Sequence, residues 1–277
     1  MLEALQYEFM RNAVLAGLLA SIVCGTIGSL VVVNRLVFLS GGIAHAAYGG
    51  IGLAFFFGLS YTLGTLGFSL VVAVVMATVT LKAKHRSDTI IGVLWAVGMA
   101  LGVILLDLKP GYNVDLMSYL FGSILAVPTS DLWLMVSLSG VILLTVGFLY
   151  NDFLAMSYDE EFAQLRGAPV RLLHYLLLAM VALSVVMIIR VVGLILVIAL
   201  LTIAPYIAEK KSESLRGMMV MATLLNVLFT TLGLWLSYAL NLTSGAAIIA
   251  VGAICFFVSL GMERLAPKRR SLTGGPL

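Results

Sequence analysis

Of the three histidines in the chain, His45 is the one whose position suits it best for chemistry. It follows the run of small residues SGGIA and lies about nine residues into an apolar stretch predicted to span residues 36–58. An ionisable group at that depth is costly unless it faces a cavity or a partner, and a neutral imidazole is a common ligand of transition metals. We therefore predict that His45 contacts a metal ion. The alternative is a histidine that hydrogen-bonds a neighbouring helix.

Asp115 is the second candidate metal contact, since it stands just before the apolar segment LMSYLFGSIL. A carboxylate in an outer vestibule would attract a cation and help to remove its waters stepwise. The alternative is a helix N-cap or a loop carboxylate. The two cysteines, Cys24 and Cys255, lie in apolar runs without CxxC spacing and are predicted to be small buried side chains.

Glycines are concentrated around His45, in the stretch SGGIAHAAYGGIGLAFFFG. Small side chains let membrane helices approach closely, because helix association in lipid depends on packing. We predict that Gly41, Gly42 and Gly49 line a pathway beside a locally deformable helix. The alternative is tight helix packing alone.

Composition places the chain in a membrane. Its 277 residues are 62% hydrophobic and 10% charged, whereas soluble domains carry roughly 25% charged residues. At about 20 apolar residues per helical span, this length leaves no room for a separate soluble catalytic domain. The net charge of +3 comes from basic residues in short loops, which indicates orientation in a lipid bilayer and not nucleic-acid binding.

Apolar windows of about 19 residues predict an all-α, polytopic membrane protein with eight to nine transmembrane helices. A segment within residues 111–131 has about 10 apolar residues, too few to cross, and is predicted to be re-entrant or interfacial. The sixth and seventh spans are joined so closely at residues 190–193 that one broken helix is an alternative. The predicted spans are 12–33, 36–58, 62–81, 89–107, 131–150, 172–189, 192–208, 217–240 and 245–262.

Basic clusters predict the orientation, because loops rich in Lys and Arg face the cytoplasm. Nine spans then place residues 1–11 outside and the C-terminus inside. We predict one transmembrane domain over residues 1–264 and a cytoplasmic, disordered tail over residues 265–277. The clusters are Lys82, Lys84, His85 and Arg86; Arg166 and Arg171; Lys210, Lys211 and Arg216; and Lys268, Arg269 and Arg270.

The polar connection NDFLAMSYDEEFAQLRGAPVR has the signature of a short capped helix at residues 158–168. The acidic residues Asp159, Glu160 and Glu161 compensate the positive end of the helix dipole, and Gly167 with the proline beyond it ends the helix. A capped helix held against the inner membrane face suits docking into a groove of a cytoplasmic partner. The alternative is a surface helix without a partner.

Sequence motifs for nucleotide binding or catalysis are missing: there is no GxxxxGK[ST] loop, no HExxH and no Ser/His/Asp arrangement. The chain is therefore predicted not to be an enzyme and to hold no cofactor of its own. If ATP drives its function, another subunit must bind the ATP. The predicted spans also lack the several carboxylates of a proton- or sodium-coupled carrier.

Four stretches, in this order and spacing, resemble the membrane subunits of bacterial and archaeal ABC importers for zinc, manganese and iron, the metal-type ABC-3 permeases. The resemblance implies a type II importer-like permease of the cytoplasmic (inner) membrane. It also implies a homodimer that imports a divalent metal ion with a cytoplasmic ATP-binding subunit and an extracytoplasmic solute-binding protein. The stretches are MRNAVLAGLLASIVCGTIGSLVVVNRLVFLSGGIAHAAYGGIGLAF, LMSYLFGSIL, DEEFAQLRGAP and RVVGLILVIALLTIAP.

By the same resemblance, the helix at residues 158–168 is the coupling helix that contacts the ATPase. The residues that carry this role are the three acids already named together with Phe162, Ala163, Arg166 and Gly167.

The metal-contact pattern of the family is only partly present. His45 matches the family's histidine in the second span, but Gly41 stands where the family usually has Asp. A lone histidine from each half of a dimer would give a weaker and softer site, completed by Asp115 or by water.

Two other readings of the sequence remain open. The missing carboxylate leaves room for a metal chelate as cargo, as in iron-chelate or cobalamin importers, whose permeases usually have more spans. The chain could also be a standalone channel, secondary carrier or intramembrane enzyme. An enzyme would need paired catalytic groups at one depth, and the sequence offers only His45.

Overall fold

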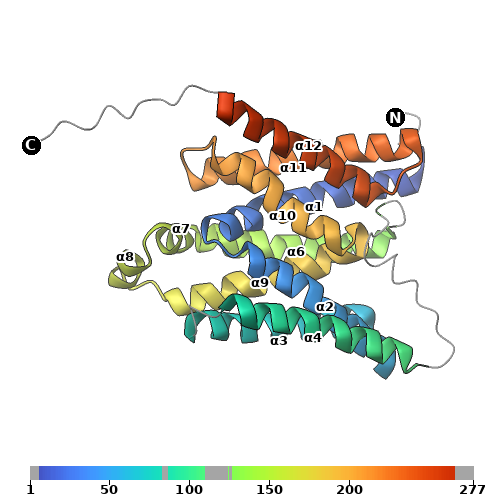
Figure 1. The fold of residues 1–277 in the computed structure, drawn as a ribbon, viewed down its shortest axis with the longest axis horizontal. Coiled ribbons are helices and arrows are strands. Elements are labelled where there is room, and N and C mark those ends of the chain that lie inside the picture. The colour runs from blue at the N-terminus through green and yellow to red at the C-terminus, as the bar shows by residue number, and fades with distance from the viewer. Residues whose placement is uncertain (1–5, 83–86, 110–123, 125–126, 266–277) are drawn as a thin grey trace, which may run out of the picture.

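The computed structural model describes residues 6–82, 87–109, 124 and 127–265, and every regular element among them is a helix (Figure 1). The predicted all-α fold is confirmed. The α-helices are α1 (Glu8–Val33), α2 (Val37–Phe57), α3 (Tyr61–Lys82), α4 (Ser87–Asp107), α6 (Thr129–Phe148), α7 (Tyr150–Tyr158), α8 (Glu160–Leu165), α9 (Val170–Val192), α10 (Leu194–Glu209), α11 (Leu215–Leu240) and α12 (Ser244–Leu265).

Eight of the described helices are long and apolar enough to cross a membrane: α1 to α4, α6, α9, α11 and α12. The ninth apolar helix, α10, has 16 residues, about 24 Å at 1.5 Å per residue. That length is somewhat below the hydrocarbon thickness of about 30 Å. Whether the chain has eight or nine spans therefore depends on whether α10 runs the length of the bundle.

Hydrogen bonds show which helix ends lie together. At one end, the hydroxyl of Thr129 at the start of α6 donates to Glu8 at the start of α1 (3.2 Å). At the other end, which we name the α8 end, the amide of Asn34 after α1 donates to Ser157 in α7 (2.8 Å). There too, His174 near the start of α9 bonds Thr80 near the end of α3 (2.9 Å).

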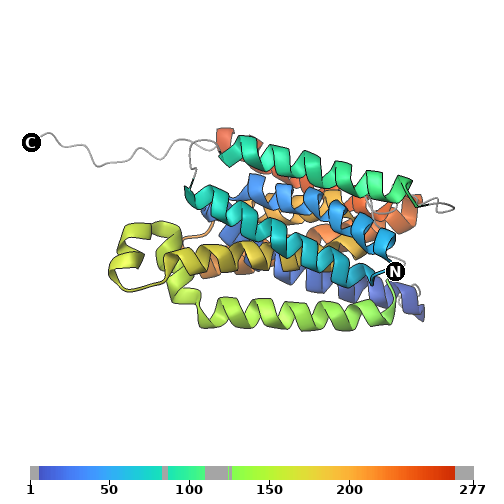
Figure 2. The same cartoon turned by 90° about the horizontal axis from the view of Figure 1, so that it is seen from below.

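The same argument places the later helices. Arg216 at the start of α11 lies over the ring of Tyr150 in α7 (4.4 Å), so α11 begins at the α8 end. Only a short turn separates α10 from α11, and Lys210 after α10 pairs with Glu263 near the end of α12 (2.6 Å). Helix α9 therefore runs away from the α8 end and α10 runs back to it. The chain traverses the bundle nine times in its described part, with the start of α1 and the end of α12 at opposite ends (Figures 1 and 2).

Gly193 separates α9 from α10. Its φ of 80° and ψ of 165° lie in a backbone region that residues other than glycine rarely adopt. Such a backbone conformation ends α9 and lets α10 start in a new direction within one residue. At residues 190–193 the structure therefore has two separate helices, and not the single broken helix that the sequence left open.

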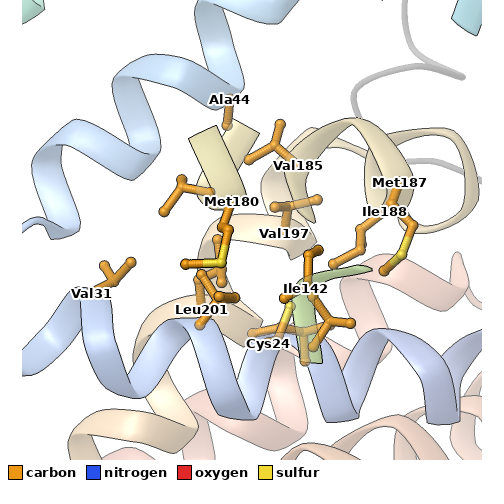
Figure 3. Packing of buried hydrophobic residues seen from close by; sticks show 14 of the residues in the cluster. Cys24, Val31, Ala44, Ile142, Met180, Val185, Met187, Ile188, Val197 and Leu201 are labelled. Atoms are coloured by element: carbon orange, nitrogen blue, oxygen red, sulfur yellow. The ribbon is translucent and has the colours of Figure 1, made fainter. Parts of the chain in front are cut away.

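The core lies between α1, α2 and α9. About three quarters of the apolar window of α1 and α2 (78% each) and 67% of that of α9 are buried, against 22% for α4 and α6. Figure 3 shows Cys24 and Val31 of α1 and Val197 and Leu201 of α10 gathered in this core with side chains of α9. The outer helices expose their apolar faces, as expected where lipid or a partner subunit covers them.

The helix α2 packs most closely against α4 through glycines. A Cβ atom on Gly98 would lie 2.7 Å from the Cα atom of Ala46, and one on Gly52 would lie 2.5 Å from the carbonyl oxygen of Gly102. Gly98 and Gly102 form a GxxxG pair on α4, the spacing that lets two membrane helices touch along their backbones. This contact fixes α4 beside His45.

Two sequence predictions need comment. Residues 150–158 were expected to be the end of a span and a loop, but they form the separate helix α7, which turns the chain toward α8. The predicted re-entrant segment falls largely in residues 110–123, and the tail beyond Leu265 in residues 266–277; both lie outside the described residues.

Candidate functional site

His45 lies on α2 and stacks on Trp95 of α4. The ring centroids are 4.0 Å apart and the planes are inclined by 14°. The imidazole is half-buried, and its Nδ1 atom is buried without a hydrogen-bond partner among the described residues. Among the described residues, Nδ1 of His45 therefore makes no hydrogen bond to a neighbouring helix, which was the alternative role for this side chain.

Trp95 is a site residue that the sequence did not indicate. Its indole N–H points to the Sδ atom of Met99 one turn later (3.2 Å), and the ring of Phe38 on α2 lies 6.2 Å away. These contacts hold the indole from its edge and from the α2 side. A stack between two helices has no signature in either helix alone, so only the fold brings Trp95 to His45.

Gly41 leaves space beside His45. A Cβ atom at Gly41 would meet, within 4 Å, only the Cδ1 atom of Ile198, at 3.9 Å. Residues four apart share a face of a helix, so a side chain at this position would lie next to the imidazole. The described residues contain no group of three His, Cys, Asp or Glu side chains that could hold a metal ion. A metal at His45 would therefore need ligands from elsewhere, such as water or a second copy of the chain.

The other predicted pathway glycines lie in helix contacts. A Cβ atom on Gly42 would be 2.7 Å from Ile91, and one on Gly49 would be 2.8 Å from the ring of Phe68. These contacts account for the small residues by packing against α3 and α4, and a pathway-lining role for these glycines stays a prediction. Asp115, the second predicted metal contact, lies outside the described residues.

The predicted coupling helix is α8, at the far end of the bundle (Figure 1). It is shorter than residues 158–168, because its N-cap is Asp159, whose carboxylate accepts the N–H of Phe162 (2.9 Å). At the other end Gly167, with φ 83°, donates to the carbonyl of Gln164 (2.9 Å), and Ala168 donates to that of Ala163 (3.0 Å). This pair of bonds is a Schellman motif, which ends a helix within one residue.

One face of α8 is anchored and another is exposed. Ala163 is fully buried, whereas Phe162 is 51% and Leu165 is 88% exposed. The guanidinium of Arg166 lies 5.8 Å from the centroid of the Phe162 ring, and Glu161 is exposed beside it. Ala163 therefore holds the helix in place, while an apolar pair rimmed by charge faces outward. Leu165 belongs to this surface although it was not among the predicted contact residues.

A cavity of about 160 Å³ separates α8 from the transmembrane helices. The residues around it come from the turn after α1 and from α3, α7, α8 and α9. The lining residues are Asn34, Leu36, Thr80, Leu81, Met156, Glu160, Val170 and His174. Glu160 lines this cavity, although it is exposed overall like its neighbour Glu161.

The α8 end of the molecule also collects basic side chains. Lys210 is fixed by its hydrogen bond to Glu263 (2.6 Å) and lies over the ring of Tyr206 (4.4 Å). The hydrogen bond to Glu263, with a further contribution from Tyr206, raises the pKa of the Lys210 ammonium. Lys210 therefore stays charged at neutral pH, and Arg166 and Arg216 lie at the same end. The predicted inner face of the membrane and the α8 end coincide.

Comparison with known proteins finds similar chains. The chain is 51% identical over 264 residues to an uncharacterized membrane protein of Synechocystis, covering 95% of this chain and 94% of that protein. It is 32% identical to the manganese transport system membrane protein MntC of Listeria monocytogenes, covering 96% and 93%. Among solved structures, PsaBC from Streptococcus pneumoniae in complex with a Fab matches with a TM-score of 0.86 and 31% identity, covering 98% and 97%.

The family model described as the ABC 3 transport family matches residues 6–263, which is nearly the whole chain. The match includes α2 with His45 and the short helix α8. Members of this family are membrane permeases, and their chains carry no enzymatic activity. The chain therefore belongs to the ABC 3 transport family, as a metal-type permease subunit of an ABC importer.

Proposed function

We propose that this chain forms half of a homodimeric pathway for import of a divalent transition metal ion, with Mn²⁺ as the first candidate. The observation that carries the proposal is the likeness of the whole chain, including α2 and α8, to PsaBC. The name of the Listeria relative supports manganese as the ion to test first. The energy comes from ATP hydrolysed on a separate subunit.

The metal contact in this proposal is His45. A cation that enters a helix bundle must find ligands, because an isolated charge in the membrane interior is costly. One imidazole offers a single ligand, but a twofold axis beside α2 would bring a second His45 to the same path. The apolar window of α4, which flanks His45, is only 22% buried in one chain, so its outer face is open to a partner or to lipid.

The ATPase contact in this proposal is α8. Phe162 and Leu165 form an exposed apolar pair on a helix that is capped at both ends and anchored by Ala163. A rigid helix with an apolar centre and a charged rim has the composition of a docking site. The cavity beneath it is lined by residues at the ends of α3 and α9 and in the turn after α1, and we expect motion of α8 to change their packing. The pathway then opens in turn to each side of the membrane.

Uptake by the reconstituted importer tests the proposal. The permease, its ATP-binding subunit and its solute-binding protein are placed in proteoliposomes, and accumulation of radioactive Mn²⁺ is followed with and without ATP. We expect accumulation that requires ATP and is competed by other free divalent transition metals. Accumulation of a ferric chelate or cobalamin without competition by free Mn²⁺ would favour a chelate importer. Accumulation that does not depend on ATP would favour a standalone carrier or channel.

A further inference from the structure

The contact between His45 and Trp95 is closer and flatter than ordinary aromatic packing. Aromatic rings usually stack with centroids about 4.5 to 7 Å apart, whereas these centroids are 4.0 Å apart with an inclination of 14°. The indole itself is held by Met99 and flanked by Phe38. Trp95 is therefore a rigid plate against which the imidazole lies flat.

A histidine that binds metal needs something to orient its ring. The usual device is a hydrogen bond from the second ring nitrogen to a carboxylate, carbonyl or water. At His45, Nδ1 is buried without such a partner among the described residues. One turn earlier on α2 stands Gly41, which has no side chain that could bond the imidazole. With both devices missing from the described residues, the face of Trp95 is the contact that fixes the plane of the imidazole.

We propose that Trp95 is the positioning residue of this metal-contact site, which rests on the role proposed above for His45. The indole holds the imidazole plane, so a ring nitrogen meets the incoming ion in one orientation. Because the face of an indole attracts positive charge, the stack also favours the imidazole when it carries a metal cation. The site would thus offer an incoming divalent transition metal ion one oriented imidazole nitrogen, without a carboxylate from α2.

Packing alone is the competing role for Trp95, and spectroscopy separates the two. A paramagnetic ion bound to an imidazole that touches the indole quenches the fluorescence of that indole strongly. The chain has three tryptophans, Trp95, Trp133 and Trp235. Trp133 is 72% and Trp235 is 52% exposed, so both can be replaced by Phe to leave Trp95 as the only reporter.

The first measurement uses the full-length permease with W133F and W235F in lipid nanodiscs, titrated with MnCl₂. We expect saturable quenching of Trp95, which disappears when His45→Ala is added. The matched control carries W95F and W235F and leaves Trp133 as the reporter. Its fluorescence should not respond. Saturable quenching that persists without His45, or equal quenching of Trp133, would overturn the inference.

The second measurement compares Mn²⁺ dissociation constants. Loss of an orienting neighbour typically weakens metal binding by at least about tenfold, and we expect that loss for Trp95→Ala. Trp95→Phe keeps an aromatic ring against the imidazole, so its Mn²⁺ dissociation constant should stay close to that of wild type. A side chain that only fills space would not need to be aromatic. Trp133→Ala is the control for loss of an indole elsewhere.

The outcomes separate this inference from the proposed function. If His45→Ala abolishes Mn²⁺ binding while Trp95→Ala leaves it at the wild-type value, the inference fails and the role of His45 stands. If His45→Ala leaves binding and uptake unchanged, the proposed metal contact fails and the inference fails with it. Should Trp95→Ala not fold, the quenching experiment decides alone, because it keeps Trp95 in place.

Discussion

The empty space beside His45 makes a gain of function possible at a single residue. A Cβ atom at Gly41 meets only Ile198 within 4 Å, so Gly41→Asp should be accommodated and should place a carboxylate one helical turn before the imidazole. We expect Mn²⁺ to bind about tenfold more tightly, equivalent to about 1.4 kcal/mol. Calorimetry on the permease in nanodiscs measures the change.

Gly41→Asn is the matched control, because it adds the same volume without the charge. Its Mn²⁺ affinity should stay close to that of wild type. Equal affinities for the Asp and Asn variants would show that this position does not face the site.

At the residue scale, sequence reasoning located half of the candidate site. His45 was identifiable because an ionisable group inside an apolar run is costly, and this cost is visible in one segment. Trp95 was not identifiable, since a tryptophan in an apolar helix is ordinary and its contact with His45 depends on how α2 crosses α4. The free space at Gly41 and the close contacts at Gly42 and Gly49 likewise follow from helix crossings and not from the glycines themselves.

Among the helices, the α2–α4 contact is the one that holds the site together. In Gly52→Ala the new methyl group would lie 2.5 Å from the carbonyl oxygen of Gly102, and a backbone atom cannot move aside cheaply. Overpacking of this kind costs about 1–3 kcal/mol, so the variant should denature at lower temperature and bind Mn²⁺ less well. Gly140→Ala on α6 is the control, because nothing lies within 4 Å of its Cβ position. Equal melting temperatures of the two variants in the same detergent would contradict this account.

The docking surface of α8 yields a second prediction for a single element. Phe162→Ser and Leu165→Ser should each weaken binding of the ATP-binding subunit, because exposed apolar side chains at the centre of an interface contribute about 1–2 kcal/mol or more. Binding is measured by co-purification of the ATPase with the permease and by the affinity of the two proteins in biolayer interferometry. Leu59→Ser changes an exposed leucine at the opposite end of the bundle and should leave binding unchanged. A loss of binding in that control but not in the α8 variants would place the ATPase elsewhere.

The sequence predicted most elements within a few residues, because lipid imposes a long apolar window on every span. It also located α8, since caps and a terminal glycine are local signals. Helix α7 was missed because its nine residues are too few for a span and include the polar Asn151 and Asp152, so the stretch was assigned to the connection. The separation of α9 from α10 required the backbone conformation of Gly193, which composition alone does not reveal.

For the whole molecule, the arrangement of the ends predicts the orientation in the membrane. Lys and Arg side chains gather at the α8 end, which should therefore face the cytoplasm. In a background with Cys24→Ala and Cys255→Ala, Ser60→Cys between α2 and α3 should react with an impermeant maleimide in intact cells. Glu213→Cys between α10 and α11 should react only after permeabilisation. Both positions are exposed, so the reverse labelling pattern would invert the proposed direction of transport.

The most direct test of the account is Mn²⁺ uptake by the complete importer carrying His45→Ala. The importer should assemble with its ATPase and hydrolyse ATP, yet accumulate Mn²⁺ about tenfold more slowly, because the ion loses a ligand within the membrane. His85→Ala, which changes a histidine between α3 and α4 in the sequence, should transport at the wild-type rate. Wild-type uptake in the His45→Ala importer would contradict the claim that α2 carries the metal contact.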